Sequence, residues 1–319
     1  MPTPESFVPI AITNRSGLDE SVHYGALVAL GPSGEIEFAV GDPFAVVYPR
    51  SSNKPMQTVA MVRAGLRLPP DLLALVCGSH DGTTMHTDGA RRILAGAGLG
   101  EEALANTPSL PLDQVSAEAV LRAGLPRTSL LMNCSGKHSG MLATCVLNGW
   151  AHDSSYLHVD HPLQLAITAA IDELCDEPHA HIGVDGCGAP AHAMSLVGLA
   201  RAFRSIARAA AGPAGDDVYA AMTAHPEMVG GAQRDVTAFM RHVPGLMAKD
   251  GADGVFAAAL PDGRAVALKI ADGGDRARPP VMVAALQALG IDTTAVAPLV
   301  EERIMGHGRP VGVVRAIAP

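Results

Sequence analysis

The chain has 319 residues, of which 48% are hydrophobic and 17% charged, and its net charge is −9 at pH 7. This balance is typical of a well-buried globular protein and not of a disordered chain. The negative charge and the lack of a Lys/Arg cluster argue against nucleic acid or an anionic membrane as a partner. No apolar run approaches the roughly 20 residues that cross a bilayer, and the opening residues, MPTPESF, lack the regions of a signal peptide.

Five cysteines are too few, and odd in number, for a disulfide scaffold. We therefore expect a cytoplasmic protein, in which a functional cysteine acts as a metal ligand or a reactive thiol. Cys77, Cys145 and Cys175 lie on predicted apolar faces and are expected to be core residues.

The hydrophobic pattern predicts strands at both ends of the chain and helices between them. In chain order, strands are predicted at 8–13, 26–29 and 35–40, a helix at 54–66, a short apolar strand at 71–77, and helices at 84–97, 116–123, 136–150 and 161–175. A strand at 181–184 and a mostly helical region at 196–242 follow, then strands at 245–249, 254–260 and 264–270, a helix at 279–289 and a strand at 309–316.

Strands at both ends predict an α+β fold whose sheet unites the N- and C-terminal segments and is flanked by helices. No interdomain linker or internal repeat is evident. We expect one domain over residues 1–319, with a helical subregion at roughly 84–242.

The segment RSSNKP at residues 50–55 opens the first predicted helix. Ser51 and Lys54 are three residues apart, so they would share the N-terminal face of that helix. An uncharged lysine amine within hydrogen-bond reach can accept the proton of a serine hydroxyl and make it a nucleophile. Ser52 would point elsewhere, which favours Ser51. The alternative is a serine that only caps the helix.

The segment NCSGKHSGM at residues 133–141 has the densest set of reactive side chains and leads into a predicted helix. Helix N-termini lower thiol pKa values, so we expect Cys134 to tend toward thiolate. Cys187 lies in DGCG, another small-residue loop. With Lys137 and His138 the two cysteines could form a zinc site, although their spacing matches no structural zinc finger and a lysine ligand must first lose its proton. The alternative is a glycine-rich turn with a buried cysteine.

Two further residues are candidates for chemistry. Ser79 lies in CGSHDG, where a small-residue loop after an apolar strand can expose a hydroxyl; the alternative is an ordinary turn serine. Lys249 ends the predicted apolar strand LMAK, which suggests that its amine is directed to a particular site; the alternative is a solvated side chain. The glycine-containing loops lack the Gly-x-x-x-x-Gly-Lys-Ser/Thr pattern of a P-loop.

Taken together, these segments resemble one family, the rhizobial-type L-asparaginases, also called class 3 or the asparaginase II family. Each motif is weak alone, but the set follows the family's order across nearly the whole chain, and the segment around Cys134 is highly specific. The matches are Arg50-Ser51-x-x-Lys54-Pro55, Ser79-His80 with His86 downstream, Asn133-Cys134-Ser135-Gly136-Lys137-His138-x-Gly140-Met141, Asn148-Gly149-Trp150, Asp160-His161-Pro162-x-Gln164, Asp185-Gly186-Cys187, His225-Pro226-Glu227-Met228 and Lys249 before Gly251.

The resemblance implies hydrolysis of L-asparagine to L-aspartate and ammonia. It implies a fold similar to serine β-lactamases and serine glutaminases, and a homodimer. It also implies two Ser–Lys pairs, Ser51 with Lys54 and Ser79 with Lys249.

A metal site and a set of polar side chains around the substrate are implied as well. The zinc ligands by this resemblance are Cys134, Lys137 and Cys187, and the polar residues that line the site are Arg50, His138 and Asp185. Asp185 could pair with the α-ammonium group of the substrate. One departure is Thr83, which stands where family members usually carry an acidic residue.

We expect acyl-enzyme chemistry from these residues. Ser51 attacks the side-chain amide carbonyl of asparagine, neutral Lys54 accepts its proton, and Ser79 relays a proton to the departing ammonia. Water then hydrolyses the β-aspartyl ester. A lysine that is neutral near pH 7 needs its pKa lowered by about three units, or about 4 kcal/mol, which burial and a like charge such as Lys249 can supply.

Two rivals stay open. One is a zinc-dependent amidohydrolase in which Cys134, Cys187 and His138 activate water and Ser51 is incidental. The other is an amino-acid sensor that keeps the pocket without turnover. Within the acyl-enzyme interpretation, glutamine competes with asparagine as substrate, because pocket discrimination of one methylene amounts to only about 1–3 kcal/mol.

Overall fold

The computed structural model describes residues 3–317, and its main element is an antiparallel sheet built from both ends of the chain. Seven strands follow in the order β10-β11-β1-β2-β9-β8-β7, and β3 pairs with β2. The strands are β1 (Val8–Arg15), β2 (Leu18–Leu30), β3 (Ile36–Val40), β7 (Met247–Gly251), β8 (Val255–Ala259), β9 (Ala265–Ile270), β10 (Arg303–Gly306) and β11 (Arg309–Ala316). The predicted α+β fold, with a sheet that unites the two terminal segments, is confirmed.

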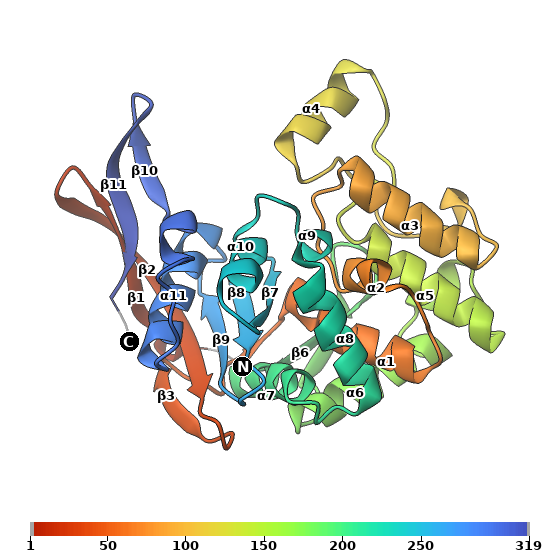
Figure 1. Ribbon diagram of the computed structural model, residues 1–319, viewed down its shortest axis with the longest axis horizontal. Helices are drawn as coiled ribbons and strands as arrows, with labels where there is room; N and C mark the ends of the chain where they lie inside the picture. The colour runs from red at the N-terminus through yellow and green to blue at the C-terminus, as the bar shows by residue number, and fades with distance from the viewer. Residues whose placement is uncertain (1–2, 318–319) are drawn as a thin grey trace.

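The middle of the chain forms a helical layer beside this sheet (Figure 1). Its helices are α1 (Lys54–Arg63), α2 (Pro70–Val76), α3 (Thr84–Gly96), α4 (Gln114–Arg122), α5 (Ser135–Asn148), α6 (Pro162–Cys175), α7 (Leu196–Ala207), α8 (Pro213–Ala224), α9 (Pro226–Val229) and α10 (Asp235–His242). A further helix, α11 (Arg278–Ala288), lies between β9 and β10 in the chain. A small second sheet has the order β4-β6-β5, formed by β4 (Val46–Val47), β6 (Pro190–Ser195) and β5 (His181–Val184).

Helices pack on the central strands from both sides, which explains their apolar sequences. Every residue of β7 and β8 is buried, and both α7 and α11 contact β8 and β9. Strands covered on both faces show continuous apolar runs instead of alternation. On the helical side, α1 is buried at every position from Lys54 to Val62 and contacts α5, α6 and α8.

One predicted strand is wrong. Residues 71–77, read as a short apolar strand, form helix α2 and its C-cap. A short apolar run cannot be assigned by periodicity alone. Pro70 occupies the first turn of the helix, where its fixed φ suits helical backbone, and the helix is surrounded by α3, α5, α8 and α9. Burial on all sides, and not strand pairing, accounts for its hydrophobicity.

The N-terminal hairpin is longer than its sequence pattern indicates. Strand β2 begins at Leu18 and not near residue 26, because its polar first half pairs with β1 across a turn at Ser16 and Gly17. Both turn residues have positive φ, 50° and 89°, the geometry of a tight hairpin turn. The exposed half of this strand carries the polar residues that obscured it.

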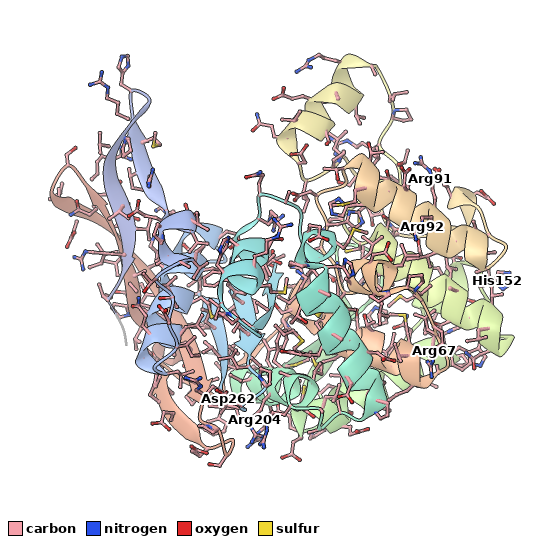
Figure 2. The ribbon with its side chains drawn as sticks, viewed as in Figure 1. Arg67, Arg91, Arg92, His152, Arg204 and Asp262 are labelled. Carbon is pink, nitrogen blue, oxygen red and sulfur yellow. The ribbon has the colours of Figure 1, made fainter. Side chains whose placement is uncertain are left out.

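The surface of the helical side carries charged and polar side chains that point outward, among them Arg67, Arg92 and His152 (Figure 2). No helix within residues 3–317 combines the length and the hydrophobicity needed to cross a membrane.

Gly251, the last residue of β7, sets how closely the main sheet approaches the turn before α1. A Cβ at this position would lie 2.2 Å from the carbonyl oxygen of Pro49 and 3.0 Å from Oγ of Ser52. Real Cβ atoms do not come so close to backbone, so any larger residue would push the turn and the strand apart.

We therefore expect Gly251→Ala to lower the free energy of unfolding by about 1–3 kcal/mol, the usual cost of overpacking. Denaturant unfolding followed by circular dichroism measures it. Gly96→Ala is the matched control, since a Cβ there meets nothing within 4 Å, and this variant should unfold no earlier than the wild type. Equal stability of the two variants would contradict the proposed close approach.

Candidate active site

The sequence contains four lysines, and three of them are buried in the part of the molecule that the sequence analysis singled out. Lys54, Lys137 and Lys249 are each at most 1% exposed. Buried ammonium groups are costly unless they are paired or hydrogen-bonded. Their partners therefore define the candidate site.

Ser51 lies in a single 3-10 turn, η2 (Arg50–Asn53), and Lys54 is the first residue of α1. The two residues thus flank the junction of the two helices, and the Lys54 backbone N–H donates to the Ser51 carbonyl. Ser51 lines a cavity. Ser52 instead donates its hydroxyl hydrogen bond to the backbone oxygen of Lys249, over 2.9 Å. Of the two serines, Ser51 is the one that faces the cavity.

Arg50 holds this turn from the outside. Its φ of 52° is in the left-handed region, which a non-glycine residue seldom adopts. Its guanidinium group donates to Asp185 Oδ1 over 2.8 Å and also pairs with Asp253. Arg50 and Asp185, both predicted to contact substrate, are therefore bonded to each other. Strained backbone beside a candidate nucleophile is a common feature of functional sites.

The Lys54 amine contacts the second candidate serine. Its Nζ donates to Ser79 Oγ over 2.9 Å and to the Gly78 carbonyl over 2.5 Å. Gly78 must be small, because a Cβ would lie 2.8 Å from the carbonyl oxygen of Met228. No hydrogen bond to the Ser51 hydroxyl occurs within residues 3–317. The structure thus brings Lys54 to Ser79, a pairing that differs from the implied Ser51–Lys54 and Ser79–Lys249 pairs.

The loop that carries Ser79 is fixed by its neighbours on both sides. The Ser79 N–H donates to the Val229 carbonyl over 2.8 Å. His80 Nε2 lies 3.0 Å from Ser135 Oγ at the start of α5, and the His80 ring stacks on His86 at 5.0 Å. Burial, together with the charges of His86 and Lys54, holds the pKa of His80 well below its usual value, so His80 is neutral near pH 7.

Lys249 is fully buried and pairs with the next residue in the chain. Its Nζ lies 2.5 Å from Asp250 Oδ1 and 2.6 Å from the Asp250 carbonyl oxygen. Burial and the charge of Lys54 lower the pKa of Lys249 to about 8, against the opposing effect of Asp250. Although burial favours the protonated carboxyl, the charges of Lys249, Arg234 and Arg278 hold the pKa of Asp250 below its usual range.

A cavity of about 580 Å³ brings several of these groups together. Ser51, Ser79 and Asn133 line it, along with the charged side chains of Arg234 and Asp250. The three predicted substrate-binding residues, Arg50, His138 and Asp185, are absent from this lining.

Sequence reasoning missed Arg234, Asp250 and Arg278, which supply much of the charge in this cavity. Asp250 could have been noticed because it directly follows Lys249. Arg234 lies in a polar loop and Arg278 at the start of α11. Neither carried a local signal, because their proximity to the site depends on how the helices pack against β7.

The two cysteines of the candidate metal site lie together. Cys134 is the N-cap of α5, and Cys187 lies in the loop between β5 and β6. Each thiol is the first cause of the shift in the other's pKa: the pKa of Cys187 is lowered and that of Cys134 is raised. Lys137 Nζ lies 3.2 Å from Cys187 Sγ, so the amine can stabilise a negative charge shared by the pair. The expectation that Cys134 tends toward thiolate stays a prediction.

The donor atoms here suit zinc in their chemistry. Zn²⁺ prefers thiolate sulfur and neutral nitrogen ligands. Besides the two sulfurs, Nε2 of His138 is buried and makes no hydrogen bond among the described residues, while its Nδ1 contacts Tyr156 over 2.7 Å. Burial lowers the pKa of His138, which keeps the ring neutral.

Lys137 fits a metal less readily. Burial alone would lower its pKa, but the charges of Cys187, Cys134 and Asp185 raise it, and a ligand amine must be neutral. Within residues 3–317, no three or more His, Cys, Asp and Glu side chains group so as to hold a metal ion. A metal at this place would rely on the two cysteines and would displace the Lys137 proton.

The described cysteines are all free thiols. Cys77, Cys145 and Cys175 are at most 1% exposed and belong to the main hydrophobic core. Their prediction as small core residues is confirmed.

Similar solved structures include a β-lactamase from Mycobacterium bovis, with 17% sequence identity over 83% of this chain and 94% of that chain, at a TM-score of 0.39. The Bacillus subtilis glutaminase YbgJ, in covalent complex with 5-oxo-L-norleucine, matches with 12% identity over 89% of this chain and 93% of that chain, at a TM-score of 0.40. The native form of Mglu matches with 14% identity over 88% and 68% of the two chains, at a TM-score of 0.46.

The comparison with curated proteins returns no relative. A family model described as L-asparaginase II matches residues 11–316, which is nearly the whole chain. The protein is an amidohydrolase that belongs to the L-asparaginase II family.

Proposed function

We propose that the protein hydrolyses L-asparagine to L-aspartate and ammonia through an acyl-enzyme formed on Ser51. The observation that carries this proposal is one cavity lined by both Ser51 and Ser79, with the amine of Lys54 on the Ser79 hydroxyl. In a member of the L-asparaginase II family, this arrangement supplies a nucleophile, a base and a proton relay.

In the proposed first step, Ser51 Oγ forms a bond to the side-chain carbonyl carbon of asparagine. Its proton passes to the neutral amine of Lys54, and the Lys54–Ser79 hydrogen bond offers a route from that amine to the leaving nitrogen. The carbon–nitrogen bond breaks and ammonia leaves. A water molecule then adds to the β-aspartyl ester, gives its proton back through the same groups, and releases aspartate and Ser51.

The contact of Lys54 with Ser79 supports a relay role for Ser79 in this scheme. Lys54 and Lys249 are close enough for the charge of Lys54 to lower the pKa of Lys249. Such coupled lysines share their protons as a pair.

For the metal, we propose that Cys134 and Cys187 would hold a zinc ion, with Lys137 or His138 as a nitrogen ligand. A bound zinc ion would supply a fixed positive charge that orients the substrate. One contact supports this proposal. The loop of Cys187 also carries Asp185, which is bonded to Arg50 beside the proposed nucleophile. The loop thereby connects the cysteine pair to the turn Arg50–Asn53, which we call the catalytic turn.

A glutaminase activity is the second candidate. A cavity of about 580 Å³ lies within the usual size of small-molecule sites and has room for the one additional methylene of glutamine.

A homodimer and a cytoplasmic location, which the resemblance and the composition predict, stay predictions. Light scattering of the purified protein would test the first.

Replacement of the nucleophile should abolish turnover. We expect Ser51→Ala to lower kcat for asparagine by about 10³-fold or more, since loss of a nucleophile removes the covalent route. Coupled-enzyme detection of ammonia measures it. Ser52→Ala removes the neighbouring hydroxyl and should retain kcat within about tenfold. An active Ser51→Ala enzyme that needs zinc would instead favour the metal-activated water mechanism.

Zinc content should depend on the cysteine pair. Protein purified without chelator is expected to carry about one zinc ion per chain, and Cys187→Ser to lose most of it, as measured by mass spectrometry of the metal. Cys145→Ser, in the core and away from the pair, is the control and should keep its zinc. Chelation should raise KM for asparagine more than it lowers kcat. Absence of zinc together with full activity in EDTA would remove the metal from the proposal.

The preferred amide should be asparagine. We expect kcat/KM for asparagine to exceed that for glutamine by roughly 10- to 200-fold, the range that one methylene allows. Ammonia release from both substrates and hydrolysis of a β-lactam form the comparison. A preference for glutamine would reassign the substrate and leave the acyl-enzyme scheme in place, whereas no turnover of any of the three would support the sensor interpretation.

A further inference from the structure

Asp250 is a buried carboxylate that lines the cavity of the candidate site. The proposed reaction does not use it. Its side chain is 4% exposed. One carboxylate oxygen lies 2.5 Å from Lys249 Nζ, and the other accepts a hydrogen bond from Arg234 over 2.6 Å. Arg278 lies 4.0 Å from the second oxygen. One negative charge therefore lies among three positive ones.

The strand that carries Lys249 and Asp250 packs directly on the catalytic turn. Ser52 of that turn donates to the Lys249 carbonyl, and Gly251 approaches Pro49 so closely that a Cβ would clash. Lys249 is thus fixed at its backbone by the turn and at its amine by Asp250. The side chains of Lys249 and Asp250 are therefore held in one geometry in the interior, where an unpaired charge is costly.

Arg234 fixes Asp250 in turn. Besides its bond to Asp250, it reaches Asp81 Oδ1 over 3.3 Å, in the loop that also carries Ser79. The network therefore links β7 to the Ser79 loop through two carboxylates and one guanidinium group. The network thus connects Lys249 with the loop that carries Ser79, a connection that an ion pair with only a structural role does not require.

We propose that Asp250 is a positioning residue that keeps the Lys249 ammonium charged and fixed beside the turn of residues 50–53. This inference rests on the proposed function, because it assigns Lys249 the role of a fixed positive charge in that reaction. Asp250 itself touches neither Ser51 nor Ser79 by a hydrogen bond within residues 3–317.

The electrostatics agree with this geometry. Burial lowers the pKa of Lys249 to about 8, and Asp250 is the group that most strongly opposes the fall. Lys249 is therefore charged below about pH 8 and loses its charge above it. Removal of the Asp250 charge lowers the pKa of Lys249 further, so the loss of charge moves to lower pH.

The groups that face Lys249 come from four elements. They are Asp250 on β7, Lys54 at the start of α1, Arg234 before α10 and Cys77 at the end of α2. Burial raises the pKa of Cys77 to about 12, so this thiol is neutral in the relevant range. Lys54 and Arg234 both lower the pKa of Lys249. Asp250 is the one carboxylate among these four groups.

The test is the pH dependence of kcat/KM for asparagine in Asp250→Asn, which keeps the shape and removes the charge. The wild type should lose activity on the alkaline side near pH 8. In Asp250→Asn this alkaline limb should move down by at least about one pH unit, so kcat/KM at pH 7.5 should fall by about threefold or more. The thermal midpoint confirms that the variant is folded.

Asp275→Asn is the matched control. Asp275 lines the same cavity and lies 3.3 Å from Arg278, but it is exposed and not bonded to Lys249. Its replacement removes one carboxylate from the cavity and should leave the alkaline limb in place. A folded Asp250→Asn enzyme whose alkaline limb coincides with that of the wild type would overturn the proposal.

A second measurement depends neither on Asp250→Asn nor on enzymatic activity. In wild-type protein labelled with ¹⁵N at lysine Nζ, the Lys249 signal is identified by its absence from Lys249→Arg. The proposal requires this group to be protonated at pH 7 and to titrate near pH 8; titration below pH 7 would overturn it. If the chain showed no amidase activity, the proposed function would fail while this titration still decided the protonation of Lys249.

Discussion

The burial of three lysine amines is the constraint on which the rest of this structure depends. Each amine would be unfavourable in the interior by several kcal/mol if it lacked a partner. Lys54 binds Ser79, Lys137 binds Cys187, and Lys249 binds Asp250. Three separate segments of the chain are therefore held at one place by these contacts, and that place is where the main sheet meets the helical layer.

Small residues make this convergence possible. Gly251 lets β7 approach the turn before α1, and Gly78 lets the Ser79 loop pass close to the backbone at Met228. Helix α1, which is buried from Lys54 to Val62, anchors the base of the site from the helical side. Because its first residue is Lys54, the amine enters the interior at the N-terminal end of the most enclosed helix. A site built on packed elements in this way holds its side chains more precisely than one built on free loops.

The two serines and the two lysines of the candidate site differ in their surroundings. The Lys54 amine contacts Ser79, while Ser51 lines the cavity. Lys249 has a carboxylate partner, whereas Lys54 has only neutral oxygen acceptors. In the reaction that we propose, these differences distinguish a relay hydroxyl from a nucleophile, since environment sets the roles of like groups within one site.

The sequence by itself determined the α+β class, most of the helices, and the segments that carry Ser51, Ser79, Cys134 and Lys249, because these signals are local: hydrophobic period, small-residue loops and ordered motifs. The family match covers residues 11–316, the part of the chain that holds all of these motifs. Which lysine meets which serine, and that Cys134 lies beside Cys187, followed only from the tertiary structure. It also brought Arg234 to the site. Those outcomes depend on burial and on distances between elements far apart in the chain, and no local pattern encodes them.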